Sequence, residues 1–176
     1  DEAYGDFTGR SSWLERLAEF PNLVVLQTFS KAWGLAGLRV GMAYSNAFII
    51  SALNKIKYPY NLNTMTIRMV LQALQLPESV QEKVQVLMSE RQRLERELPL
   101  LPCVEKIFPS DANFLLVRVT DANDIYHYLC EQGIIVRNRD KELHCGNCLR
   151  ITVGTPEENT RLLSALRSYY PPYDLR

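Results

Sequence analysis

The segment from residue 23 to residue 41 constrains the fold more than any other part of this sequence. It opens with an unbroken apolar run at residues 23–26, which is typical of a parallel strand covered on both faces. Three glycines, at positions 34, 37 and 41, then mark a loop, and the pattern predicts a second strand over 39–44 and an apolar helix over 47–55. A strand, a glycine-rich loop and a helix in this order predict an α/β layer architecture.

The rest of the chain predicts a second, smaller unit. Pro77 opens a long helix whose apolar residues form one stripe, and such a helix is long enough to connect two domains. Strands are expected at 104–108, 114–119, 134–137 and 149–153, with helices at 124–132 and after Thr155, where Thr-Pro-Glu-Glu fits a capping box. We therefore predict the C-terminal part of a larger, mainly parallel α/β domain over residues 1–83 and a small α+β domain over 84–176.

Charge and composition narrow the class of partner. Twenty basic residues balance twenty acidic ones, so the formal net charge is zero, and the chain lacks the long-range field that binding to nucleic acid or to an anionic membrane needs. No apolar run approaches the roughly 20 residues of a membrane span. The first residues have neither a basic nor an apolar targeting region. These features predict a cytoplasmic protein that binds small molecules and neither nucleic acid nor membrane.

The four cysteines lie in the last part of the chain and form no regular framework, which favours reduced thiols in the cytoplasm. Cys145 and Cys148 form a single C-x-x-C in a predicted hairpin. A structural zinc site needs a second ligand pair, and a thioredoxin-type motif needs a helix start. We therefore predict a turn at Gly146-Asn147 and no metal, with a metal or redox site as the alternative.

Hydroxyl, amine and guanidinium groups gather around the glycine-rich loop. Thr28 and Ser30 point to the same side of an extended strand, so two hydroxyls can face one phosphate, and Arg39 offers a bidentate fork to the same anion. Lys31, beside them, is placed to form a Schiff base with a carbonyl cofactor. The alternative interpretation, which an isolated Ser-Lys pair would favour, is that Lys31 is an exposed lysine next to a tight turn and binds no cofactor.

Four motifs carry a resemblance to a known family over residues 1 to about 170. They are Asp1-Glu2-Ala3-Tyr4, Ser30-Lys31 with the following Gly34-Leu35-Ala36-Gly37-Leu38-Arg39-Val40-Gly41, Ala112-Asn113-Phe114-Leu115, and Leu149-Arg150-Ile151-Thr152-Val153-Gly154-Thr155. With these motifs the sequence resembles the class I and II, fold-type I aminotransferases, which use pyridoxal 5'-phosphate. Within that family it is most similar to the histidinol-phosphate aminotransferases.

The resemblance implies a role for each residue of the first two motifs. Lys31 is the catalytic lysine that binds the cofactor covalently, and Thr28, Ser30 and Arg39 hold the cofactor phosphate. Asp1 pairs with the pyridinium nitrogen and Tyr4 with the phenolic oxygen of the ring. A carboxylate beside the ring nitrogen keeps that nitrogen protonated, which favours electron withdrawal from the substrate.

Arg137 and Arg150 form a second candidate site for substrate. Both lie near the ends of neighbouring predicted strands, so they can converge although they are apart in sequence. The resemblance implies that Arg150 takes the α-carboxylate of glutamate and that Arg137 contributes to the substrate phosphate. The alternative is a pair of surface arginines bound to Asp140 or Glu142.

The activity that this resemblance implies is transamination in histidine biosynthesis. Histidinol phosphate and 2-oxoglutarate would give imidazole-acetol phosphate and glutamate, in a homodimer. Alternatives are another class I or II enzyme of the same cofactor, such as an aromatic aminotransferase or a threonine-phosphate decarboxylase, and a binding module without catalysis.

The family's upstream parts, including the first half of the large domain, do not occur in this sequence. We therefore expect a fragment of an enzyme about twice as long, inactive by itself. Its residues before about 76 would expose apolar surface, whereas residues 84 to 170 would fold alone.

Overall fold

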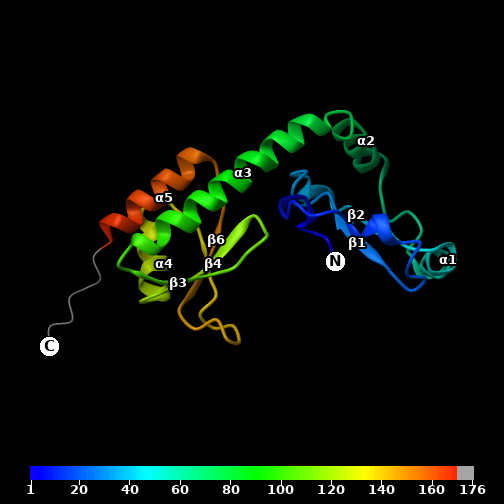
Figure 1. The fold of residues 1–176 in the computed structure, drawn as a ribbon. Coiled ribbons are helices and arrows are strands. Elements are labelled where there is room, and N and C mark those ends of the chain that lie inside the picture. Colours follow the sequence, from blue (N-terminus) through cyan, green and yellow to red (C-terminus); the bar gives the residue numbers. More distant parts are fainter. Residues whose placement is uncertain (170–176) are drawn as a thin grey trace. The chain divides into compact units, whose positions relative to one another are not determined.

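The computed structural model describes residues 1–169 and divides into two compact units, residues 1–84 and residues 85–176 (Figure 1). The expected division was 1–83 and 84–176, and residues 170–176 of its second part lie outside the described residues. Helix α3, Pro77–Glu97, crosses the boundary between the two units. The mixed α/β class predicted from the sequence is confirmed.

The first unit contains a two-stranded sheet and short helices. Strand β1, Val25–Thr28, pairs with β2, Gly41–Tyr44. Helices α1, Ala47–Ile56, and α2, Thr64–Ala73, begin at Asn46 and Asn63, whose side chains accept hydrogen bonds from backbone N–H groups in the first turn. Three 3-10 helices complete the unit, Gly5–Phe7, Trp13–Arg16 and Ala36–Leu38.

The predicted parallel strand over residues 23–26 is wrong for this part of the chain. Within residues 1–169, β1 pairs only with β2, and the pairing is antiparallel, with Val25 opposite Tyr44. Only one side of the strand is well covered, since Val25 is 2% exposed and Leu26 is 45% exposed. An apolar run indicates which side chains require burial and leaves the direction of the partner strand open. Here the loop after β1 returns the chain alongside it.

Much apolar surface of the first unit is exposed. Helix α1 has no buried residue, and Phe48 and Ile56 on it are 83% and 79% exposed. The small core of this unit is built on Phe29, Val40 and Val70. The prediction of exposed apolar surface before residue 76 is therefore confirmed.

The second unit is a four-stranded sheet with helices. Its further elements are β3, Val104–Phe108, β4, Phe114–Val119, α4, Ala122–Glu131, β5, Arg137–Asn138, β6, Cys148–Thr152, and α5, Pro156–Ser168. The strand order is β3-β4-β6-β5, and all neighbours are antiparallel. The strand predicted over 134–137 is wrong except at Arg137, because β5 covers only residues 137–138 and Ile134 packs against the core from the loop after α4.

The two faces of this sheet differ in chemistry. On β4, Leu115, Val117 and Val119 are almost fully buried, and they join the core that contains Leu129 of α4 and Leu163 of α5. The alternate residues of β4 are Phe114, Leu116 and Arg118, which are half-buried on the opposite face. Strand alternation thus separates the core from a face that carries aromatic and cationic side chains.

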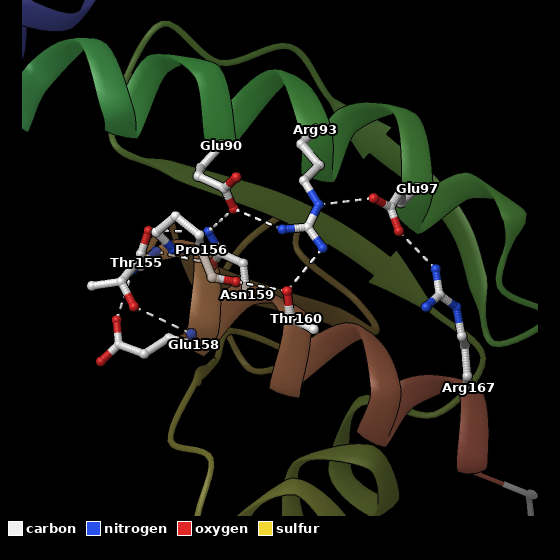
Figure 2. A network of polar contacts seen from close by, with 10 residues as sticks. Glu90, Arg93, Glu97, Thr155, Pro156, Glu158, Asn159, Thr160 and Arg167 are labelled. Atoms are coloured by element: carbon white, nitrogen blue, oxygen red, sulfur yellow. Dashed lines mark hydrogen bonds and ion pairs between the residues drawn. The ribbon is translucent and has the colours of Figure 1, made fainter.

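A buried polar network joins α3 to α5 (Figure 2). Asn159, 2% exposed, donates to the Glu90 carboxylate at 2.9 Å, and its amide also bonds the N–H and C=O of Gly154. Arg93 contacts Glu90, Glu97 and Thr160, and Arg167 extends the network to Glu97. Thr155 and Glu158 form the predicted capping box at the start of α5.

We expect the substitution Asn159→Ala to destabilise the chain by about 2–3 kcal/mol, because it removes one hydrogen bond from the buried Glu90 carboxylate and leaves two Gly154 backbone groups without their partner. Urea denaturation followed by circular dichroism measures this loss. The matched control is Thr160→Ala on the same helix, where an exposed hydrogen bond to Arg93 is removed. If Asn159→Ala and Thr160→Ala lowered the free energy of unfolding equally, the larger effect expected for the buried hydrogen bonds would be contradicted.

Candidate active site

A surface depression of the first unit collects most of the residues predicted to bind a cofactor. Five of the six line it, namely Asp1, Thr28, Ser30, Lys31 and Arg39. The sixth residue, Tyr4, lies beside Lys31, whose Nζ is 5.0 Å from the centroid of the tyrosine ring. The structure therefore brings a carboxylate, an amine, hydroxyls and a guanidinium together within one unit.

Glu2 fixes the N-terminal segment against β1. Its backbone N–H donates to Leu26 O at 2.8 Å, and its carboxylate accepts hydrogen bonds from Ser12 Oγ, Trp13 N and Gln27 Nε2. Burial raises the pKa of this carboxyl, but the three hydrogen bonds outweigh burial and hold the pKa below its usual value. Because Asp1 and Tyr4 flank Glu2, this anchor places both next to the strand that leads to Lys31.

Sequence reasoning missed the role of Glu2. The three residues that bond its carboxylate are 10, 11 and 25 positions away in the sequence. No local spacing connects these positions, so no motif of the kind used for helix caps predicts the contact.

The loop that presents Lys31 is held by its neighbours. Thr28 Oγ1 donates to Val40 O at 3.1 Å and accepts from Ser30 N at 3.0 Å. Phe29 is buried, and its ring lies 5.3 Å from that of Trp33. The Thr28 hydroxyl was expected to face a phosphate, whereas here its proton is directed to Val40 O. Thr28 thus braces the loop in this structure, and Lys31 extends from a fixed backbone.

Arg39 adopts an uncommon backbone conformation. Its φ of 57° and ψ of 44° lie in the left-handed region, which a residue with a side chain rarely occupies. Its Nη1 donates to Ala36 O at 2.9 Å, and the residue is otherwise exposed. Such strained residues concentrate at functional sites. The guanidinium keeps further N–H groups directed to solvent, where an anion can bind.

Arg137 and Arg150 are direct cross-strand neighbours in the second unit. They are register partners on β5 and β6, so their side chains start from the same face of the sheet. The two strands are neighbours, as the sequence predicts, and the convergence of the two side chains on one substrate stays a prediction. The alternative of ion pairs with nearby acids does not describe the structure, since Glu142 pairs with Arg139 and Asp140 accepts a hydrogen bond from Asn147 N.

The Cys145–Cys148 segment is a tight turn. Cys148 N donates to Cys145 O at 3.0 Å, and Asn147 has a positive φ of 55°. The predicted turn at Gly146-Asn147 is confirmed. The four cysteines are free thiols, and no group of three or more His, Cys, Asp or Glu residues within positions 1–169 is arranged to hold a metal ion.

Helices in the part of the chain that the structure describes are too short or too polar to cross a membrane.

The fold and both clusters fit one class of enzyme, and sequence comparison identifies it. The family model for aminotransferase class I and II matches residues 1–166, so the chain belongs to the class I and II aminotransferases. The chain is 52% identical over 169 residues to the histidinol-phosphate aminotransferase of Bacteroides fragilis, covering 96% of this chain and 49% of that protein. The chain thus spans about half the length of the curated relatives it matches.

Solved structures show the same fold. The histidinol-phosphate aminotransferase of Clostridium acetobutylicum matches with a TM-score of 0.86 and 24% identity, over 95% of this chain and 52% of that one. The enzyme of Sinorhizobium meliloti, solved in complex with pyridoxal-5'-phosphate, matches with a TM-score of 0.80 and 28% identity, over 95% of this chain and 47% of that one.

Proposed function

We propose that this chain forms one half of a histidinol-phosphate aminotransferase that uses pyridoxal 5'-phosphate. The reaction reversibly converts histidinol phosphate and 2-oxoglutarate to imidazole-acetol phosphate and glutamate, and in histidine biosynthesis glutamate is the amino donor. The observation that carries the proposal is the gathering of Asp1, Ser30, Lys31 and Arg39 in one depression. The 52% identity to a relative of that name supports the choice of substrate.

The residues of the depression fit the cofactor. Lys31 would hold it covalently through Nζ, while Ser30 and Arg39 would donate to its phosphate and Thr28 would brace the phosphate loop. Asp1 would face the ring nitrogen and Tyr4 the phenolic oxygen. When bound, the cofactor supplies an acceptor for the electron pair left on the substrate Cα after deprotonation. Directed donors of this kind hold an anion without a high net charge.

Lys31 has a second task in this proposal. As a free amine, its Nζ would act as the base that removes the proton from the substrate Cα. The ring of Tyr4 lies 5.0 Å from Lys31 Nζ, so it would help to place this side chain next to the cofactor ring.

Arg137 and Arg150 are proposed to bind substrate anions. Arg150 takes the α-carboxylate, for which the planar guanidinium fork is suited. Its neighbour Arg137 contributes to the phosphate that histidinol phosphate carries and glutamate lacks. Two adjacent cations on one face suit substrates that present one or two anionic groups.

The whole enzyme is proposed to be a cytoplasmic homodimer. The exposed apolar side chains of α1 and α2, such as Phe48, Ile56 and Met65, need a covering surface. The other half of the enzyme and a second subunit would supply it, so residues 1–176 by themselves are expected to be inactive. The free thiols suit a reducing compartment.

The experiment is product analysis with the enzyme that contains this chain. Pyridoxal phosphate is added first. A visible absorbance band from the bound cofactor indicates an enzyme, and the absence of such a band indicates a binding module. Histidinol phosphate and 2-oxoglutarate are then supplied, and NMR follows glutamate. Glutamate formed in step with the keto phosphate supports the proposal. Release of carbon dioxide from threonine phosphate without glutamate formation would assign a decarboxylase instead.

A further inference from the structure

The ring of Phe114 lies against the guanidinium of Arg150. Phe114 pairs with Thr152, and Arg150 pairs with Leu116, so the two residues are diagonal neighbours on one face of β4 and β6. Arg150 Cζ is 5.0 Å from the centroid of the phenylalanine ring. Among residues 1–169, Arg150 forms no ion pair, and its buried Nε has no hydrogen-bond acceptor. Ring packing is therefore the main contact that holds this guanidinium.

The backbone that carries Phe114 is itself fixed. Ser110 Oγ donates to Phe114 O at 2.6 Å and accepts from Ala112 N at 3.1 Å. Arg91, which is 8% exposed, donates through Nη1 to Ala112 O at 2.8 Å. Asn113 O accepts from Val153 N on the chain just after β6. The start of β4 is thus tied on both sides, so the ring has a defined position relative to β6.

We propose that Phe114 is the positioning residue for Arg150, holding its guanidinium in the orientation that takes a substrate carboxylate. The inference rests on the carboxylate role proposed above for Arg150. Bidentate binding requires two N–H groups of one guanidinium to meet two carboxylate oxygens in one plane. An arginine without an ion pair would lose rotational freedom on binding, and packing it in advance against a ring lowers that cost. The contact leaves the two Nη groups for the ligand.

The molecule contains a matched control for this contact. On the same face, Arg118 Cζ lies 5.5 Å from the ring of Phe108, and its buried Nε also lacks an acceptor among the described residues. Arg118 is opposite Cys148, whereas Arg150 is opposite Arg137. Phe108→Leu therefore removes the same type of contact from an arginine that has no part in the proposed substrate site.

The test is steady-state kinetics of the intact enzyme with glutamate as amino donor. Phe114→Leu is expected to raise KM for glutamate about tenfold and to leave kcat within about twofold, because Arg150 binds the carboxylate equally in the ground and transition states. Phe114→Tyr keeps the ring and should restore the low KM. Phe108→Leu should leave both constants unchanged. If Phe114→Leu does not fold, as judged by thermal melting, Phe114→Met takes its place.

Combining Phe114→Leu with Arg150→Ala in one double variant distinguishes a failure of the positioning role of Phe114 from a failure of the carboxylate role proposed for Arg150. If Phe114 acts through Arg150, Phe114→Leu should have no further effect on KM in the Arg150→Ala background. A tenfold effect that persists there would overturn the positioning role, as would equal kinetics for Phe114→Leu and Phe108→Leu. If Arg150→Ala itself left KM for glutamate unchanged, the proposed carboxylate site would fail, and the inference would fail with it.

Discussion

Replacing Lys31 by alanine in the intact enzyme is expected to abolish measurable transamination, with turnover lowered by about 100- to 10,000-fold or more. The substitution removes the amine that would hold the cofactor and the base that would take the proton from the substrate Cα, so both tasks fail together. Lys31→Arg should be similarly inactive, because a guanidinium keeps the charge but cannot act as the free amine. The loss of turnover is measured by fixed-time assays of glutamate formation.

Lys55→Ala is the matched control for the Lys31 prediction. Lys55 is an exposed lysine in the last turn of α1, in the same unit of the chain. Its removal should leave turnover and thermal stability unchanged. Substantial turnover in Lys31→Ala would contradict the catalytic assignment, whatever the behaviour of the control.

The second large loss of activity is expected when either arginine of the cross-strand pair, Arg137 or Arg150, is replaced by alanine. Arg150→Ala should weaken use of glutamate by about 1.5–3 kcal/mol, the cost of losing a charge-assisted hydrogen bond, which is about 10- to 150-fold in kcat/KM. Arg137→Ala should lower kcat/KM for histidinol phosphate by a similar factor and should lower kcat/KM for glutamate much less. Substrates are discriminated by contacts that only one of them makes, and the phosphate is the group that glutamate lacks.

The two arginine variants control for each other, since they remove the same side chain from directly paired positions. Measuring kcat/KM for both substrates with both variants gives four values. A loss at Arg137 that is equal for the two substrates would indicate a structural role. Unchanged glutamate kinetics in Arg150→Ala would remove the carboxylate site from the account.

Short-range signals in the sequence predicted the local structure well. Thr155 begins a helix as its side-chain chemistry indicates, and β3 and β4 have the predicted bounds. The neighbourhood of Arg137 and Arg150 was also predictable, because strands joined by a hairpin pair with each other. In each case the determining residues are close together along the chain.

Contacts between distant residues could not be read from the sequence. The partner of β1 and its direction depend on how the loop between residues 29 and 40 folds back, and the expected parallel pairing was wrong. The carboxylate of Glu2 and the amide of Asn159 bind groups up to 25 and 69 positions away. For the candidate site, the motifs predicted which residues matter, whereas the strained backbone of Arg39 and the bond from Thr28 to Val40 emerge only in three dimensions.

The most direct test of the central claim is to locate the cofactor on the chain. The intact enzyme is loaded with pyridoxal phosphate, reduced with borohydride so that the cofactor remains on the lysine that carries it, and digested for peptide mapping by mass spectrometry. The account predicts the label on Lys31, in the peptide that follows Thr28-Phe29-Ser30. A label on any other lysine, with Lys31 unmodified, would contradict it.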